Sequence, residues 1–217
     1  MKVYVKAWSA WAPGIETKEE WLSFIKENKS LSDSAESPEL PFAPSLFKRR
    51  LSQLSRMVIQ TGHSVAEHHD SLKITFASVY GEISQQLQIA KKLLDTHQVS
   101  PAAFSLSVFN APVAALSILD KNTAGYTALF PGKDAFRLGL LDAAAAIQSG
   151  SDEERLFIYA DEYIPEEYRS IISHMTYPFS LALVLTKKQD ESIAELPSSL
   201  NQYDTALSFL KDLLVLK

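Results

Sequence analysis

Residues 72–98, LKITFASVYGEISQQLQIAKKLLDTHQ, change character at Gly81. The part before this glycine is rich in β-branched and aromatic residues, which is typical of a strand. The part after it, residues 82–98, carries apolar residues at helical spacing and predicts an amphipathic helix. A strand, a glycine and a helix in this order make one βα unit, and the chain is therefore expected to have an α/β fold.

The same alternation continues on both sides of this unit. Further strands are predicted at residues 2–11, 126–130, 155–160 and 179–188, and further helices at residues 21–28, 47–69, 110–119, 131–147 and 201–217. Residues 104–109 are expected to be extended, and residues 29–45, rich in Ser, Pro and acids, predict a mobile loop. The strands RLFIYA and SLALVL lack polar alternation, as expected when helices cover both faces of a sheet. The predicted architecture is a layered αβα sheet.

Composition bounds the function. A chain of 217 residues with 46% hydrophobic content fits one domain spanning residues 1–217. The net charge of -5 argues against a general affinity for nucleic acid, and the cluster Lys48–Arg50 is interpreted as a solvated helix start or, alternatively, a phosphate site. No apolar run is long enough for a membrane span or a signal peptide, so a cytoplasmic location is expected. The absence of cysteine excludes disulfides, thiolate metal sites and cysteine nucleophiles.

The sequence contains no complete motif of the known catalytic or cofactor-binding kinds. The cluster GHSVAEHHD holds His63, Glu67, His68, His69 and Asp70, but Glu67 rather than a histidine stands four residues after His63. This spacing is poor for a shared metal, and a polar helix end is the expected reading. The chain contains no GxSxG, GxGxxG or GxxxxGK[ST] sequence, so no cofactor is predicted.

Residues 127–150, TALFPGKDAFRLGLLDAAAAIQSG, resemble the place where an enzyme mounts a nucleophile. A strand turns through Pro131 and Gly132 into a helix whose first N–H groups are free, yet the turn holds no Ser, Cys or Thr. Lys133 could hold an anion there, and Asp134 is expected to cap the helix or to be a buried carboxylate.

A second candidate lies at the end of the strand RLFIYA. Asp161 and Glu162 follow this strand directly. They could act as an acid and a base, but no nucleophile is positioned beside them, so a solvated strand-end loop is the default expectation.

Taken together, several stretches resemble one family. Gly81-Glu82 before the helix, SPAAFSLSVFNAPVAALSI (100–118), GKDAFRLGLLDAA (132–144) and YADEYIPEEY (159–168) look like the β-ketoacyl synthase-like chain length factors, short relatives of type II ketosynthases in bacterial aryl polyene clusters. The resemblance runs from residue 2 to the strand at residues 177–186. Its most specific part is residues 100–118 with the Gly81-Glu82 pair.

The resemblance implies a thiolase-like αβα half domain with a mixed sheet. In ketosynthases a cysteine at the N-terminus of a buried helix carries the acyl chain, and the equivalent turn here is Gly132, Lys133 and Asp134. The two histidines that complete a ketosynthase site belong to a C-terminal half that this chain is expected to lack. The implied protein is a noncatalytic subunit.

The resemblance also implies partners and a surface. The expected partner is a β-ketoacyl-ACP synthase in a heterodimer, with acyl carrier protein as a transient partner, and the expected role is to shape the tunnel that receives a polyene chain. The candidate interface and tunnel residues are Phe104, Phe109, Asn110, Leu116, Ala128, Leu129 and Phe130, with ordinary core packing as the alternative for the three phenylalanines. A small acyl-thioester enzyme using Lys133 and Asp134, or Asp161 and Glu162, and a structural homodimer remain alternative functions.

Overall fold

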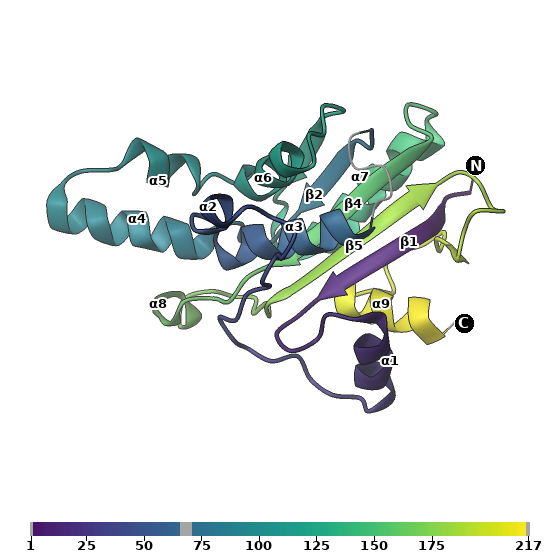
Figure 1. Ribbon diagram of the computed structural model, residues 1–217. Coiled ribbons are helices and arrows are strands. Elements are labelled where there is room, and N and C mark those ends of the chain that lie inside the picture. Colours follow the sequence, from purple (N-terminus) through teal and green to yellow (C-terminus); the bar gives the residue numbers. More distant parts are fainter. Residues whose placement is uncertain (1, 66–70, 216–217) are drawn as a thin grey trace.

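A computed structural model describes residues 2–65 and 71–215, which form one mixed sheet flanked by helices (Figure 1). The strand order is β3-β2-β4-β5-β1-β6. β2 runs parallel to β3 and β4, whereas β5 is antiparallel to β4 and β1, and β6 is antiparallel to β1. The strands span Tyr4–Trp11 (β1), Ile74–Ala77 (β2), Tyr126–Leu129 (β3), Glu154–Asp161 (β4), Phe179–Thr186 (β5) and Ala194–Glu195 (β6).

Helices cover both faces of this sheet. They span Lys18–Lys26 (α1), Ser45–Lys48 (α2), Gln53–Val65 (α3), Ile83–Thr96 (α4), Pro101–Ser105 (α5), Ala111–Leu119 (α6), Ala135–Gln148 (α7), Glu166–Arg169 (α8) and Ala206–Val215 (α9). One core cluster joins α3 and α6 to the sheet, and the other joins α1, α7 and α9 to its opposite face.

Strand β5 shows why the central strands lack polar alternation. Leu181 and Leu183 pack into the cluster of α1, α7 and α9, whereas Ala182 and Val184 pack into the cluster of α3 and α6. Because successive side chains of a strand point to opposite faces, every one of them is buried when both faces are covered. The predicted layered αβα half domain with a mixed sheet is confirmed.

Several predicted boundaries need correction. The helix predicted from residue 47 begins at Gln53, where the hydroxyl of Ser52 accepts a hydrogen bond from the N–H of Ser55 (2.9 Å), as a helix cap does. Its predicted continuation through residues 66–70 lies outside the described residues. The strand predicted to reach Gly81 ends at Ala77.

Two more differences concern short elements. Residues 104–109, predicted to be extended, begin in the last two residues of helix α5 and continue as a turn. Helix α5 has Pro101 at its first position, where the missing N–H of proline is not needed. The two-residue strand β6 was not predicted, because it is too short to show alternation.

Residues 29–44, within the predicted loop, contain no helix or strand. Side chains of α3 bind the backbone of this segment, and a side chain of α8 binds one of its carboxylates. The amide of Gln53 donates to the carbonyl of Ser34 (2.8 Å), and the guanidinium of Arg56 donates to the carbonyl of Pro38 (3.2 Å). Arg169 forms an ion pair with Asp33 (2.6 Å).

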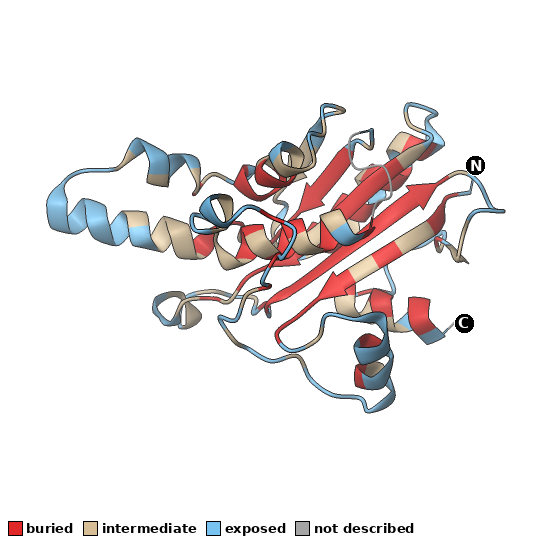
Figure 2. Ribbon diagram, in the orientation of Figure 1, coloured by how far each residue is buried: buried red, intermediate tan, exposed pale blue. Residues whose placement is uncertain are grey.

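Burial is uneven along the helices (Figure 2). Strands β2, β4 and β5 are buried almost throughout, but the outer part of α4 and helix α5 are exposed on most sides. Within residues 2–65 and 71–215, no helix has both the length and the apolar character needed to cross a membrane.

Candidate functional site

The turn before α7 keeps the shape predicted from the sequence but not the expected roles of its side chains. Gly132–Asp134 form a single 3-10 turn, with Gly132 at φ 71°, and α7 starts at Ala135. Asp134 pairs with Arg137 (3.1 Å), is about half exposed, and makes no side-chain cap bond to α7. Asp134 thus stands at the predicted N-cap position without a side-chain cap bond, and the alternative prediction of a buried carboxylate is wrong. The arginine one turn into the helix attracts the carboxylate away from the cap position.

Asp161, at the end of β4, is buried rather than solvated. Its Oδ1 accepts hydrogen bonds from the hydroxyl of Ser78 (2.7 Å) and from the N–H groups of Val79 (2.9 Å) and Tyr80 (3.2 Å). Burial raises the pKa of Asp161, while these donors oppose the shift. The expected solvated loop is wrong because the turn after β2 folds over this carboxylate.

Glu162 and Glu82 form a second buried acidic group. Glu82 accepts hydrogen bonds from the hydroxyls of Ser52 (2.8 Å) and Ser55 (2.6 Å), at the start of α3. Glu162 accepts from the N–H of Ser84 (2.9 Å), at the start of α4. The pair therefore joins the N-terminal ends of two helices, which favour negative charge.

Both glutamates titrate far from the usual range. Burial raises the pKa of Glu82 to about 7. Burial, together with the negative charge of Glu82, raises the pKa of Glu162 to about 8. At neutral pH the pair holds a proton that exposed carboxyl groups would have lost. These groups hold structure together through hydrogen bonds to helix starts.

Gly81, in the Gly81-Glu82 pair, makes room for an aromatic stack. It has φ 60°, and a Cβ at this position would lie 2.6 Å from the ring of Phe109. Phe109 stacks on Phe130, with ring centroids 4.4 Å apart, and Phe130 meets Phe76 edge-on at 5.8 Å. The missing side chain of Gly81 thus leaves room for the ring of Phe109, a predicted interface residue almost thirty positions later in the chain.

The predicted interface residues lie at or beside β3, with two exceptions, Phe104 and Leu116. Phe104 on α5 and Phe109 are 58% and 49% exposed. The amide of Asn110 donates to the hydroxyl of Tyr126 on β3 (3.0 Å). Leu116 lies in the core, where it is 1% exposed and packs against Gly62.

The remaining three predicted residues, Ala128, Leu129 and Phe130, are half-buried on or directly after β3. They join Phe109 and Tyr126 to form what we call the aromatic edge, which comprises these five residues.

Strand β3 is an outer strand of the sheet, with β2 on one side only. The N–H of Ile74 donates to the carbonyl of Gly125 (3.1 Å), and the N–H of Ser78 donates to that of Leu129 (3.3 Å). Odd-numbered residues of β3 therefore face β2 with their backbone groups. Tyr126 and Ala128 point theirs away from the sheet, and within the described chain no other strand pairs with them.

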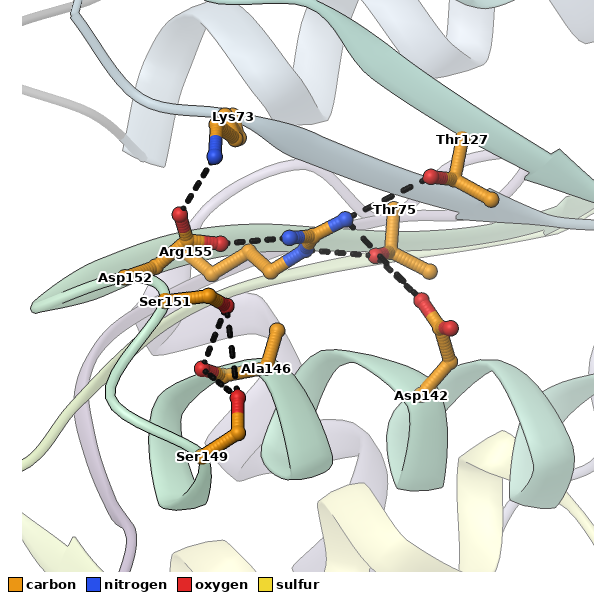
Figure 3. A network of polar contacts seen from close by, with 9 residues as sticks. All are labelled: Lys73, Thr75, Thr127, Asp142, Ala146, Ser149, Ser151, Asp152 and Arg155. Atoms are coloured by element: carbon orange, nitrogen blue, oxygen red, sulfur yellow. Dashed lines mark hydrogen bonds and ion pairs between the residues drawn. The ribbon is translucent and has the colours of Figure 1, made fainter.

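A buried arginine supports β3 from behind (Figure 3). The guanidinium of Arg155 on β4 donates to the hydroxyls of Thr75 on β2 (2.8 Å) and Thr127 on β3 (3.4 Å), and pairs with Asp152. The hydroxyl of Thr75 in turn donates to Asp142 on α7 (3.0 Å). One side chain thus links three strands, and its network reaches the helix behind them. The sequence analysis missed it, although threonines on two neighbouring strands facing an arginine are a usable signal.

The candidate metal residues form no metal site in the described part of the chain, and the alternative phosphate site at Lys48–Arg50 stays a prediction. His63 pairs with Asp120 through Nδ1 and Oδ1 (2.6 Å) and stacks on Phe42. Glu67, His68, His69 and Asp70 lie outside the described residues. Among residues 2–65 and 71–215, no group of three or more His, Asp or Glu side chains could hold a metal ion. Lys48 ends α2 and donates to the carbonyl of Glu39, so the basic cluster lies at a helix end rather than a start.

Comparison with known proteins gives the class. Residues 21–209 match the model of the beta-ketoacyl synthase N-terminal domain, and the chain belongs to that family. No curated protein sequence matches it.

Solved structures narrow the comparison. The chain is similar to a chain in the complex of the ketosynthase ApeO with its chain length factor ApeC from Xenorhabdus doucetiae, with 29% identity over 99% of this chain and 92% of that chain, and a TM-score of 0.79. The ishigamide ketosynthase/chain length factor shares the fold at 11% identity, 89% and 64% coverage, and a TM-score of 0.68. A chain in the complex of a type II polyketide synthase acyl carrier protein with its ketosynthase, AntDE:AntF, also shares the fold. It has 13% identity, 88% and 64% coverage, and a TM-score of 0.70. The chain thus spans about two thirds of the latter two.

Proposed function

We propose that this chain, as a single domain over residues 1–217, is a noncatalytic chain length factor that pairs with an active β-ketoacyl-ACP synthase in aryl polyene biosynthesis. The observation that carries the proposal is the outer strand β3. Its outward backbone groups lie beside the exposed rings of the aromatic edge, and the adjacent turn before α7 holds no nucleophile.

The lack of a nucleophile supports a role without condensation chemistry. Acyl transfer between thioesters by the ketosynthase route needs a thiolate at a helix N-terminus, and the chain has no cysteine. At the turn, Asp134 is engaged by Arg137 and Lys133 stands in solvent. Neither side chain can form the same covalent intermediate.

The aromatic edge supports pairing with another protein. An open strand edge can add a strand from a partner, and large aromatic side chains are enriched at interface centres. The relative with 29% identity is a chain of comparable length in a complex of a ketosynthase with its chain length factor. We infer that this chain occupies the chain length factor position of such a heterodimer, with acyl carrier protein visiting the ketosynthase.

Control of chain length follows from the same surface. Phe109, in the segment before α6, stacks on Phe130 directly after β3, and Phe104 is exposed on α5. If the partner's acyl tunnel ends at this surface, their rings limit the space for the growing chain, because a filled apolar pocket resists further methylene groups. Leu116 takes no direct part, since it is buried in the core.

The test is affinity purification of the tagged chain from its native host, followed by mass spectrometry and a condensation assay. We expect a ketosynthase in equal amount, and condensation of acyl and malonyl carrier protein substrates only when it is present. Condensation by the chain alone, or recovery without any ketosynthase, would contradict the proposal.

A small acid-base enzyme is the second candidate, favoured by the raised pKa values of Glu82 and Glu162. The substitutions Asp134→Asn and Glu162→Gln separate the two functions. An enzyme would lose turnover in at least one of them, whereas a pairing subunit would keep its partner and its product length in both. Light scattering of the isolated chain tests the third possibility, a homodimer.

A further inference from the structure

A narrow cavity lies beside the turn before α7, between that turn, the loop at residues 174–177 and the start of α9. Its volume is about 220 Å³. This is below the roughly 300–1,000 Å³ of sites for drug-sized ligands, so a single ring with a short chain is the largest ligand that suits it. We call this cavity the turn slot. Its lining residues used below are Lys133, Phe136, Tyr159, Met175, Thr176 and Tyr177.

The apolar side of the turn slot is aromatic. Phe136 meets Tyr159 edge-on, with ring centroids 5.7 Å apart. At the rim, Met175 and Tyr177 are 40% and 49% exposed. Edge-to-face packing is favourable for aromatic rings, and thioethers also contact ring edges well. The slot therefore offers a flat aromatic ligand an apolar surface whose contact with water is unfavourable.

The polar side of the turn slot is incomplete in the protein alone. Thr176 is buried, and its hydroxyl has no hydrogen-bond partner among the described residues. Buried hydroxyls almost always have one. Lys133 is exposed, and within residues 2–65 and 71–215 it forms no ion pair, whereas the neighbouring Arg137 is paired with Asp134. Asp204 also lines the slot and places one carboxylate near its mouth.

We propose that the turn slot is a binding site for a small aromatic carboxylic acid. The ring lies against Phe136 and Tyr159, and the carboxylate pairs with the ammonium of Lys133. The hydroxyl of Thr176, which is closed to solvent in the free protein, rotates into the slot to donate to the carboxylate. Binding is noncovalent, so no bond is made or broken. This site does not depend on the pairing proposed above, because all its residues belong to this chain and none lies on the aromatic edge.

The probe is hydrocinnamate, with hydrocinnamyl alcohol as its neutral match, titrated into the full chain and followed by amide NMR shifts. For a ligand of about eleven heavy atoms we expect a dissociation constant on the order of a millimolar. Shifts should concentrate at residues 133–136 and 174–177. The alcohol should bind about fivefold more weakly, since it lacks the charge that Lys133 attracts.

Three variants separate the contributions. Lys133→Met should weaken the binding of hydrocinnamate about fivefold and leave the binding of the alcohol unchanged, because only the charged acid interacts with the ammonium group that the substitution removes. Thr176→Val keeps the shape of the side chain and should weaken hydrocinnamate about threefold. Lys92→Met, on the exposed part of α4, is the matched control and should change neither affinity.

Equal affinity for the acid and the alcohol, or an equal effect of Lys133→Met and Lys92→Met, would overturn the carboxylate assignment. Shifts that avoid residues 133–136 and 174–177 would overturn the site itself. Because this titration uses the isolated chain, its failure leaves ketosynthase pairing intact, and failure of pairing leaves the slot intact.

Discussion

The two outer edges of the sheet differ in how far they are protected against pairing with another strand. At the β6 side, β6 covers only Tyr4 and Val5 of β1. The register of β1 against its inner neighbour β5 shifts between Val5 and Ala7. The indole N–H of Trp21 donates to the carbonyl of Ala10 (2.9 Å), and Lys2 pairs with Glu195. At the β3 side, the outward backbone groups of Tyr126 and Ala128 have no strand partner in the described chain.

This difference distinguishes an edge of the sheet that is protected against strand pairing from an edge that can bind a partner. A short strand, an irregular register, a charge and a side-chain hydrogen bond are all means by which proteins prevent unwanted strand pairing. The β1 side uses each of them, while the β3 side instead carries exposed aromatic rings. We infer that the β3 side is kept available for a partner and that the β1 side is closed to one.

The largest expected effect is on pairing at β3. In Ala128→Pro the outward N–H is removed, while the backbone bonds of β3 to β2 come from the odd-numbered residues. We expect ketosynthase binding to fall by roughly 100-fold or more, measured by biolayer interferometry, because one strand-addition bond and its neighbours are lost. Circular dichroism should show a folded chain. Ala128→Ser, which keeps the N–H, is the control, and similar losses in both variants would show that the edge itself is not used.

The next effect is the pH dependence of stability that comes from Glu82 and Glu162, which lie in the β3 half of the sheet. Their pKa values rise from the usual 4.5 to about 7 and about 8 in the folded chain. Between these limits the folded state binds more protons than the unfolded state, so the stability that the two glutamates contribute is fully present below pH 4.5 and is lost as pH rises through 8.

Glu162→Gln should remove much of this dependence. Its free energy of unfolding, from urea titrations, should exceed that of the unmodified chain by about 3 kcal/mol more at about pH 7 than at about pH 4. Trp21→Phe, at the other side of the sheet, should shift stability equally at both pH values. A dependence unchanged in Glu162→Gln would show that the glutamate pair is not its source.

Removal of a ring from the aromatic edge should have a smaller effect on pairing. Phe109→Ala deletes a half-exposed ring stacked on Phe130. We expect ketosynthase affinity to fall about tenfold, as for a typical aromatic interface residue. The products of the complex should become longer, as read by mass spectrometry of the released chains. Unchanged affinity and unchanged product length would exclude Phe109 from the interface.

The smallest effect is expected at the closed side. Trp21→Phe removes the hydrogen bond to Ala10 and leaves a buried carbonyl without its partner. The melting temperature should fall by a few degrees, corresponding to about 1–3 kcal/mol. Ketosynthase affinity should stay the same, and a loss of affinity larger than that of Phe109→Ala would reverse the assignment of the two sides.

The sequence predicted the layers well and the buried polar groups poorly. The apolar run of β5 and the helical spacing of α7 are local patterns, so they could be interpreted without other parts of the chain. The burial of Asp161 depends on the N–H of Val79, 82 residues away along the chain. No local pattern announces such a contact.

The turn after β2 shows the same limit at one element. Val79 and Tyr80 have strand-like side chains, so the predicted strand ran on to Gly81. In the fold the backbone leaves the sheet after Ala77, because its N–H groups bond to Asp161 instead of a neighbouring strand. The glycine itself was informative, since its positive φ and its contact with Phe109 mark the place where the aromatic edge begins.

The most direct test is residue-resolved hydrogen exchange of β3 in the chain alone and in the ketosynthase complex. The amides of Tyr126 and Ala128 point outward, whereas those of Thr127 and Leu129 face β2 and serve as controls within the same strand. We predict that the complex slows exchange at Tyr126 and Ala128 by at least tenfold while it changes Thr127 and Leu129 less. Equally fast exchange at Tyr126 and Ala128 with and without the ketosynthase would contradict pairing through this edge.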